Sequence, residues 1–336
     1  MDGAETHDGG ETLGEAGELA ALARILPLLP QGDATVLGPG DDAAVVAAPD
    51  GRFVVTTDTM LEGADFRLAW STWHDLGVKA VATNLIDVAA MGARPTSLVV
   101  AIAVSPATRV ADLEDFARGL AAGVAAMAPG CGVVGGDLGS GPVATIAVTA
   151  FGDLEGREPV LRSGARPGDA VWVVGALGLA AEGLRALFAA TESPERDERL
   201  EAQLAPVTPV AAGTALAELG ASAMLDVSDG LALDASRIAR ASGVVIALES
   251  ALVEAAAVGP GGEGAWLDAA LHGGEDHALL VTLPEGVEPP ETIGGHAVRR
   301  IGVVEPAGAS GPSPSGPGVT LDGEPLAARG WDPYRA

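Results

Sequence analysis

The stretch Asn84-Leu-Ile-Asp87-Val-Ala-Ala-Met-Gly-Ala93 ends a long predicted helix, and an apolar strand, Leu98 to Val104, follows it. The hydroxyl residues Ser71-Thr72 suit the start of this helix, because a side-chain oxygen there can accept hydrogen bonds from the first turn. Asn84 and Asp87 are three residues apart, so they share one face of the helix. The sequence thus predicts an apolar helix that carries two polar groups on one face close to its end.

Strands and helices follow one another irregularly along the rest of the chain. A helix is predicted over roughly Glu15 to Leu29, and Asp112 to Met127 reads as an amphipathic helix. Two strands are predicted on either side of the turn Pro49-Asp50-Gly51, and another over Val143 to Phe151. Units of strand and helix beside adjacent strands indicate an α+β protein rather than one doubly wound sheet.

The length of the chain predicts two domains. A chain of 336 residues is too long for one ordinary core, and a segment rich in Gly, Glu and Pro precedes Arg157. We expect a mobile N-terminus over residues 1–12, a first domain over residues 13–155 and a second over residues 156–336.

Acidic residues dominate the charge of the chain. They outnumber basic residues by 46 to 19, which gives a formal charge of −27. Such a field repels nucleic acid and anionic membranes, so neither is an expected partner. No apolar run approaches the ~20 residues that span a bilayer. The start, Met1-Asp-Gly-Ala-Glu, lacks the basic and apolar regions of a secretory signal, so a cytoplasmic location is expected.

Lysine, cysteine and histidine are too few or too scattered for several common sites. Lys79 is the only lysine, and Gly-Val-Lys79-Ala is not a P-loop. The single Cys131 excludes an internal disulfide and a cysteine-only metal site. The histidines have no metal-ligand spacing, and surface or capping roles are expected for His74, His272, His277 and His296.

Acids beside apolar runs are the most informative feature. They come at the ends of different predicted elements, at Asp41-Asp42, Asp58, Asp87, Asp137, Asp226, Asp229 and Glu275-Asp276. A carboxylate is costly to bury unless something neutralises it. Mg²⁺ prefers oxygen ligands and combines carboxylates with phosphate oxygens and water. Any one of these acids alone is also typical of a turn or a helix cap. Together they predict a nucleotide site built on magnesium, without a P-loop.

Seven motifs occur in the order seen in thiamine-monophosphate kinases, and the chain resembles that family from about residue 12 onward. They are Gly38-Pro-Gly-Asp-Asp42-Ala, Thr56-Thr-Asp58-Thr, Asn84 through Ala93, Gly135-Gly-Asp137, Arg162 through Asp169, Asp226-Val-Ser-Asp-Gly230 and Gly273-Gly-Glu-Asp276. The resemblance implies a two-domain α+β fold like that of aminoimidazole ribonucleotide synthetase, with an N-terminal sheet that pairs across a homodimer and a C-terminal α/β sandwich. It also implies transfer of the γ-phosphoryl group of ATP to thiamine monophosphate, the last step of thiamine diphosphate biosynthesis.

The resemblance further implies roles for single residues at positions that match the family's motifs. The implied magnesium ligands are Asp41, Thr56, Thr57, Asp58, Asp87, Asp137 and Asp226, with Asp229 holding a further ion. Of these, the implied catalytic acids are Asp58, Asp87 and Asp226. The implied ATP contacts are Gly136, Asp137, Arg162 and Ser228. The implied substrate contacts are Asp65, Glu275 and Trp331. The family often has a histidine where this chain has Asp65, although a carboxylate there suits a cationic thiazolium.

Direct in-line transfer is the expected chemistry, because the acceptor is a phosphate that is already ionised and no nucleophile is obvious. The nearest alternatives are other ATP enzymes of the same fold: a purine-synthesis ligase, a selenophosphate synthetase or a hydrogenase maturation factor. Cys131 matches the reactive cysteine of neither of the last two. Asn84 through Ala93 and Gly330-Trp331-Asp332 favour the kinase over the ligase. A non-catalytic thiamine-phosphate or nucleotide-binding module, and an acidic calcium-binding or scaffold protein, are alternatives of another class.

Overall fold

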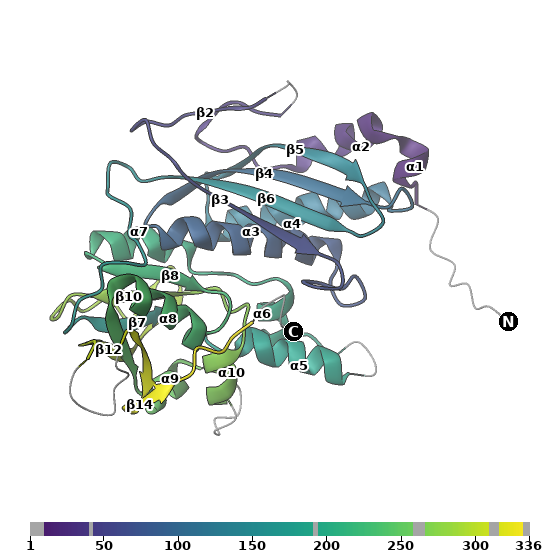
Figure 1. Cartoon of the computed structure of the whole chain (residues 1–336). Helices are drawn as coiled ribbons and strands as arrows, with labels where there is room; N and C mark the ends of the chain where they lie inside the picture. Colours follow the sequence, from purple (N-terminus) through teal and green to yellow (C-terminus); the bar gives the residue numbers. More distant parts are fainter. Residues whose placement is uncertain (1–9, 40–42, 191–193, 258–265, 309–315, 332–336) are drawn as a thin grey trace.

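The computed structural model describes residues 10–39, 43–190, 194–257, 266–308 and 316–331 and arranges most of them in two sheets with helices between and around them (Figure 1). The first sheet has four strands in the order β3-β6-β4-β5. Strands β4 and β5 are parallel, and the other neighbours are antiparallel. Helix α4 (Val110–Met127) connects the two parallel strands. The strand bounds are β3 Val54–Leu61, β4 Arg94–Val104, β5 Gly132–Ser140 and β6 Thr145–Asp153.

The second sheet has eight strands in the order β14-β13-β9-β12-β7-β10-β8, with β11 paired to β12. Its strands are β7 Ala170–Val174, β8 Ala223–Val227, β9 Val244–Leu248, β10 Ala278–Leu283, β11 Thr292–Ile293, β12 His296–Pro306, β13 Gly318–Leu321 and β14 Glu324–Leu326. Its helices are α5 Leu179–Ala189, α6 Glu198–Leu204, α7 Val210–Glu218, α8 Leu231–Ser242, α9 Ser250–Ala256 and α10 Trp266–His272. These two sheets with their helices confirm the predicted α+β class.

Helix α3 (Trp73–Ala90) lies between the two sheets and is the most enclosed helix (Figure 1). Thr72 begins it through a capping box: its hydroxyl accepts from the amide of Asp75 at 3.1 Å, and Asp75 Oδ2 accepts from the amide of Thr72 at 2.8 Å. Every residue from Asp75 to Ile86 is buried. A helix buried on all sides has no solvent face to separate from an apolar one, which explains its lack of amphipathic pattern.

Glycines let two other helices approach α3 more closely than side chains would allow. A Cβ added at Gly77 of α3 would lie 2.3 Å from the carbonyl oxygen of Phe116, and one at Gly119 of α4 would lie 2.1 Å from that of His74. On another side of α3, a Cβ at Gly213 of α7 would lie 2.1 Å from the carbonyl oxygen of Ala89. We call the four-stranded sheet with α3 and α4 the first half of the molecule, and the eight-stranded sheet with α5 to α10 the second half. Backbone contacts therefore fix the position of α3 against α4 of the first half and α7 of the second.

The N-terminal helix is shorter and more broken than predicted. Instead of one helix over Glu15 to Leu29, the structure has α1 (Leu13–Ala16), α2 (Glu18–Ile25) and a 3₁₀ turn, η1 (Leu26–Leu28). The break falls at Gly17, whose φ of 76° ends α1. A separate pair of short strands, β1 (Thr35–Leu37) and β2 (Val45–Val46), follows.

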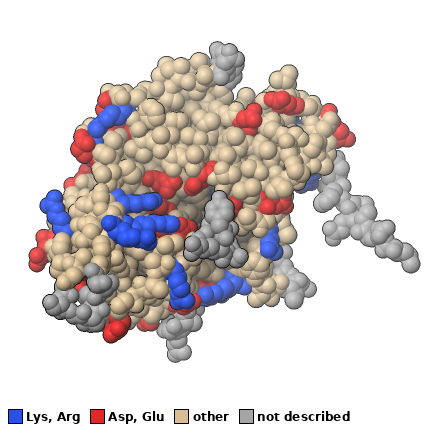
Figure 2. Space-filling view, in the orientation of Figure 1, with Lys and Arg blue, Asp and Glu red and all other residues tan. Residues whose placement is uncertain are grey.

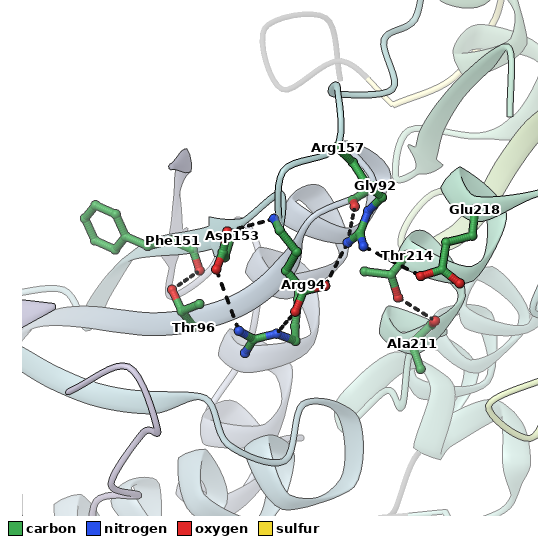
Figure 3. A network of polar contacts seen from close by, with 10 residues as sticks. Gly92, Arg94, Thr96, Phe151, Asp153, Arg157, Ala211, Thr214 and Glu218 are labelled. Carbon is green, nitrogen blue, oxygen red and sulfur yellow. Dashed lines mark hydrogen bonds and ion pairs between the residues drawn. The ribbon is translucent and has the colours of Figure 1, made fainter. Parts of the chain in front are cut away.

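A polar network holds the connection between the two sheets (Figure 3). Arg157, just after β6, donates from Nη2 to the carbonyl oxygen of Gly92 at 3.4 Å and pairs with Glu155 at 3.0 Å. Its Nη1 lies 3.6 Å from Glu218 of α7. The network ties the end of α3 and the start of the second half to the same arginine. The division after residue 155 stays a prediction.

None of the helices formed by the described residues combines the length and the apolar character that a membrane span requires.

Replacing Gly213 with alanine tests the close approach of α7 to α3. Helix propensity alone predicts a gain of about 1 kcal/mol, because alanine is the better helix former. The contact with the carbonyl of Ala89 predicts the opposite sign, a loss of about 1–3 kcal/mol from overpacking. Denaturant unfolding measures this change in the free energy of unfolding. The control is Gly141→Ala, where an added Cβ meets nothing closer than 3.7 Å. A stabilised Gly213→Ala protein would contradict the packing of α7 on α3.

Candidate active site

Two elements of the first half bring predicted site residues together. Thr56 and Asp58 are two residues apart on β3 and therefore point to the same side of the sheet, the side covered by α3. Thr56 Oγ1 donates to Oδ2 of Asp87 at 3.0 Å, and Asp87 lies on the last turn of α3. The strand and the helix thus hold Thr56, Asp58 and Asp87 in one cluster.

The second half adds Asp226 to this cluster. Asp226 lies on β8, the edge strand of the eight-stranded sheet, and is 5% exposed. Burial and, after it, the carboxylates of Asp226 and Asp58 together raise the pKa of Asp87 to about 7. Burial also raises the pKa of Asp58, and Asp226 adds to that rise. Three carboxylates from both halves therefore lie close enough to repel one another. In Figure 2, acidic side chains gather at the level where the two halves meet.

Three backbone segments converge beside Asp226. The amide of Glu275 donates to the carbonyl oxygen of Ser228 at 2.7 Å, and the amide of Trp331 donates to that of Asp229 at 2.9 Å. A Cβ added at Gly274 would lie 3.6 Å from the Cβ of Trp331. The structure therefore brings together Ser228, Glu275 and Trp331, for which the resemblance implies contacts with ATP and substrate.

Histidine 277 is not at the surface, so the expectation for it was wrong. It is 6% exposed, and its Nδ1 lies 3.7 Å from Asp226 Oδ2, too far for a hydrogen bond. Both of its ring nitrogens lack a hydrogen-bond partner among the described residues. Burial opposes its charging, but Asp226 and Glu275 raise its pKa overall. His277 is therefore a buried titratable group next to the carboxylate of Asp226, and this carboxylate favours its protonated form.

Two of the predicted acids have protein partners. Asp229 Oδ2 accepts from Arg237 Nη2 at 2.5 Å, and the same arginine pairs with Asp234. A metal ion at Asp229 would compete with this guanidinium. Asp65 Oδ2 accepts from the amide of Leu61 at 2.8 Å and closes the turn after β3. Its charge contributes to the raised pKa of Asp58, so Asp65 borders the acidic cluster.

Thr57 and Asp137 lie apart from the cluster within one chain. Thr57 alternates with Thr56 and Asp58, so it faces the side of the sheet without α3, where its hydroxyl donates to the carbonyl oxygen of Val148 at 2.9 Å. Gly136 and Asp137 lie on β5, the far edge of the sheet from β3. Three strand spacings of ~4.8 Å separate these edges by ~14 Å. The alternation of β5 also points Asp137 to the face opposite Asp58.

Arg162 is not brought to the acids either. The carbonyl oxygen of its neighbour Leu161 accepts from the amide of Met224, and Gly164 lies against Ser222, so the segment runs toward the start of β8. Asp226 is near the other end of that strand. Asp41 lies outside the described residues.

The cluster fits the chemistry of a magnesium site in its donor atoms. Asp58, Asp87 and Asp226 offer carboxylate oxygens, the hard ligands that Mg²⁺ takes. The carboxylates of the other acids contribute to the raised pKa of Asp58 and of Asp87, so a cation in this cluster would relieve repulsion. In the described part of the chain, no three His, Cys, Asp or Glu side chains are yet close enough to hold one ion. Phosphate oxygens or water would have to complete the coordination.

Comparison with known families first defines the class. The family model for the AIR synthase related protein, N-terminal domain, matches residues 40–154, and that for its C-terminal domain matches residues 166–310. The chain is thus an AIR synthase-related protein with both domains of that class. A hydrogenase maturation protein, HypE, has the same fold at a TM-score of 0.68 and 21% identity, with 92% of this chain and 96% of that chain covered.

More similar proteins identify the particular family. The thiamine-monophosphate kinase of Mycobacterium tuberculosis is 44% identical over 275 residues, which cover 80% of this chain and 81% of that kinase. The structure of AaThiL complexed with AMPPCP and TMP aligns with a TM-score of 0.73 at 28% identity, covering 97% of this chain and 99% of the other. The chain belongs to the thiamine-monophosphate kinase family.

Sequence reasoning missed three residues that the structure places at the site: Lys79, Gln203 and His277. Lys79 is 3% exposed, and its Nζ donates to Glu275 Oε2 at 2.8 Å. One signal was available, since a sole lysine inside an otherwise apolar helix needs a buried partner. No sequence feature marks Gln203 or His277 in the same way, because only the fold brings their segments to the site.

Asp276, which follows Glu275, acts as a helix cap. Its Oδ2 accepts from the amide of Gly178 at 2.6 Å and its Oδ1 from the amide of Ala180 at 3.2 Å, at the start of α5. We expect Asp276→Ala to lower the free energy of unfolding by about 2 kcal/mol, because α5 has no other side-chain cap. Asp276→Asn, which keeps an acceptor oxygen, should lose less. Thermal unfolding of both variants measures this order, and an alanine variant as stable as the wild type would contradict the cap.

Proposed function

We propose that the chain transfers the γ-phosphoryl group of ATP to thiamine monophosphate, giving thiamine diphosphate. The observation that carries this proposal is the meeting of Asp58 and Asp87 from one half with Asp226 from the other. An acidic cluster of this kind, shared by two halves, suits a phosphoryl transfer that needs no P-loop. Membership of the kinase family supplies the two substrates.

Magnesium is the metal that this donor set suits. Asp58, Asp87 and Asp226 would hold it, with Thr56 beside them. The proposal also includes Asp41 and a further ion at Asp229. Thr57 and Asp137 face the other side of the sheet, so as ligands they would belong to a site separate from this cluster. When bound, Mg²⁺ screens the charge of the reacting phosphates. Thr56 fixes the rotamer of Asp87 through the 3.0 Å hydrogen bond. His277, when protonated, would offset part of the charge of Asp226.

The residues of the chain have mainly to align the two phosphates. The acceptor phosphate is ionised near neutral pH, so no side chain has to remove a proton from it. Holding both reactants in line accounts for much of the rate enhancement in reactions of this kind. On the substrate side we propose Glu275 and Trp331, which lie on converging segments, and Asp65 at the border of the cluster. The proposed ATP contacts are Arg162, Ser228, and Gly136 and Asp137 of β5.

A homodimer is part of the proposal, because none of the described helices covers the face of the four-stranded sheet that points away from α3. Phe53 and Val55 on this face are 58% and 53% exposed, and Phe53 packs edge-on against Phe151 at 5.5 Å. A second copy placed here would cover these side chains. Thr57 and Asp137 also point to this face, so dimerisation would give both a new environment.

Use of ATP supports a cytoplasmic location, which we also propose.

One assay separates the kinase from the alternative functions. The purified protein is supplied with ATP, magnesium and thiamine monophosphate, and thiamine diphosphate is measured. A purine-synthesis ligase or a non-catalytic binding module would form none.

Asp58→Asn tests the cluster directly. The amide keeps the shape of the side chain and removes its charge, so turnover should fall by about two orders of magnitude or more while the fold survives. The matched control is Asp115→Asn, which changes an exposed acid paired with Arg118 at 2.8 Å. Circular dichroism checks the folding of both variants. A folded Asp58→Asn protein with near-normal turnover would remove Asp58 from the site.

Trp331→Ala tests the substrate side. Its side chain is 48% exposed, so the ring is open to a ligand. Stacking of an indole on a cationic ring is worth about 1–2 kcal/mol. The KM for thiamine monophosphate should therefore rise about ten-fold, with the KM for ATP unchanged. Trp331→Phe should retain part of the effect. If stability drops and both KM values rise together, Trp331 only anchors the end of the chain.

A further inference from the structure

The only lysine of the chain is buried where α3 meets α6 and the segment of Glu275. Lys79 lies on α3 and is 3% exposed. Its Nζ donates to Glu275 Oε2 at 2.8 Å and to the carbonyl oxygen of Gln203 at 3.0 Å. A lysine is seldom buried without a specific partner, because its ammonium loses its hydration. The position of Lys79 is therefore set by Glu275 and Gln203.

Gln203 completes the arrangement from α6. Its Nε2 donates to the same Oε2 of Glu275, and its side chain is also buried. Both donors thus converge on one carboxylate oxygen. Among the described residues, Oε1 of Glu275 accepts no hydrogen bond, and the side chain of Glu275 is 32% exposed. One oxygen is held by the protein, and the other is free for a ligand.

The backbone around Glu275 is held in an uncommon conformation. Its φ is 69°, in the left-handed region that residues other than glycine seldom enter. The hydrogen bond from its amide to Ser228, at 2.7 Å, fixes it there. Burial would raise the pKa of Glu275, but Lys79 and Gln203 lower it overall. Such local strain, held by several contacts, is typical of a functional position.

The location of Glu275 relative to the acids suits the acceptor substrate. Lys79 and Asp87 are eight residues apart on α3, which corresponds to ~12 Å along the helix. The reacting phosphates belong near Asp87, and Trp331 and Ser228 lie on the segments next to Glu275. A substrate with a phosphate at one end and a cationic ring at the other would span this distance.

We propose that Lys79 is a positioning residue, which, with Gln203, orients Glu275 so that its second oxygen contacts the cationic ring of the acceptor substrate. This inference rests on the proposed function, since the acceptor must carry a cationic ring. Lys79 itself repels a cationic ring, but its contact with Oε2 holds the carboxylate in place, and its charge lowers the pKa of Glu275, which favours the ionised form. The ionised, oriented Oε1 then attracts a cationic acceptor more than a neutral one.

The test compares Lys79→Met with Arg196→Met. Arg196 pairs with Asp75, also on α3, at 2.8 Å, so its loss removes an ion pair between the same two halves without touching Glu275. Calorimetry gives the Kd of each protein for thiamine monophosphate and for an analogue whose ring nitrogen is replaced by carbon and is neutral. We expect Lys79→Met to raise the Kd for thiamine monophosphate about ten-fold. The Kd for the neutral analogue and the KM for ATP should not change, and Arg196→Met should change none of them.

Glu275→Gln keeps the inference testable if Lys79→Met does not fold. It should show the same selective loss, and the double variant Lys79→Met/Glu275→Gln should bind no more weakly than Glu275→Gln. Equal losses for both ligands, or tighter binding of thiamine monophosphate to Lys79→Met, would overturn the positioning role. If the wild type neither binds nor phosphorylates thiamine monophosphate, the proposed function fails first. A wild type that does both, with Lys79→Met matching Arg196→Met, overturns this inference alone.

Discussion

The backbone contacts of α3 are the constraint on which the rest of the structure depends. Glycines at Gly77, Gly119 and Gly213 bring α4 and α7 against this helix at distances that a Cβ would not allow. A helix held in this way on two sides cannot rotate without disturbing both halves, because packed interiors adjust in discrete steps rather than continuously. Its side chains therefore have fixed positions relative to both sheets.

The charges that α3 brings together follow from that position. Asp87, on the last turn of α3, meets acids from both sheets, while Lys79, two turns earlier, meets a carboxylate of the second half. One helix thus carries an acid of the cluster near one end and a compensated ion pair further back. His277 links the two places, since both Asp226 and Glu275 raise its pKa.

The sequence predicted the fold class and most of the elements, because apolar periodicity and glycine or proline breaks are local signals. It also predicted that Asp58, Asp87 and Asp226 belong to different elements, and the structure brings these three together. Motif order could not tell that Thr57 and Asp137 point to the other face of the sheet, because this depends on strand order and register. His277 was wrongly expected at the surface for the same reason, since its burial beside Asp226 arises from pairing between distant strands.

The burial of Lys79 also has a practical consequence for handling the protein. A chain whose sole lysine is 3% exposed offers no accessible side-chain amine. Amine-reactive dyes, crosslinkers and acetylating agents would find no lysine on its surface while the fold is intact. Reaction at Lys79 would then report that α3 has separated from Glu275 and Gln203. The rate at which Lys79 is acylated could therefore measure this opening in solution.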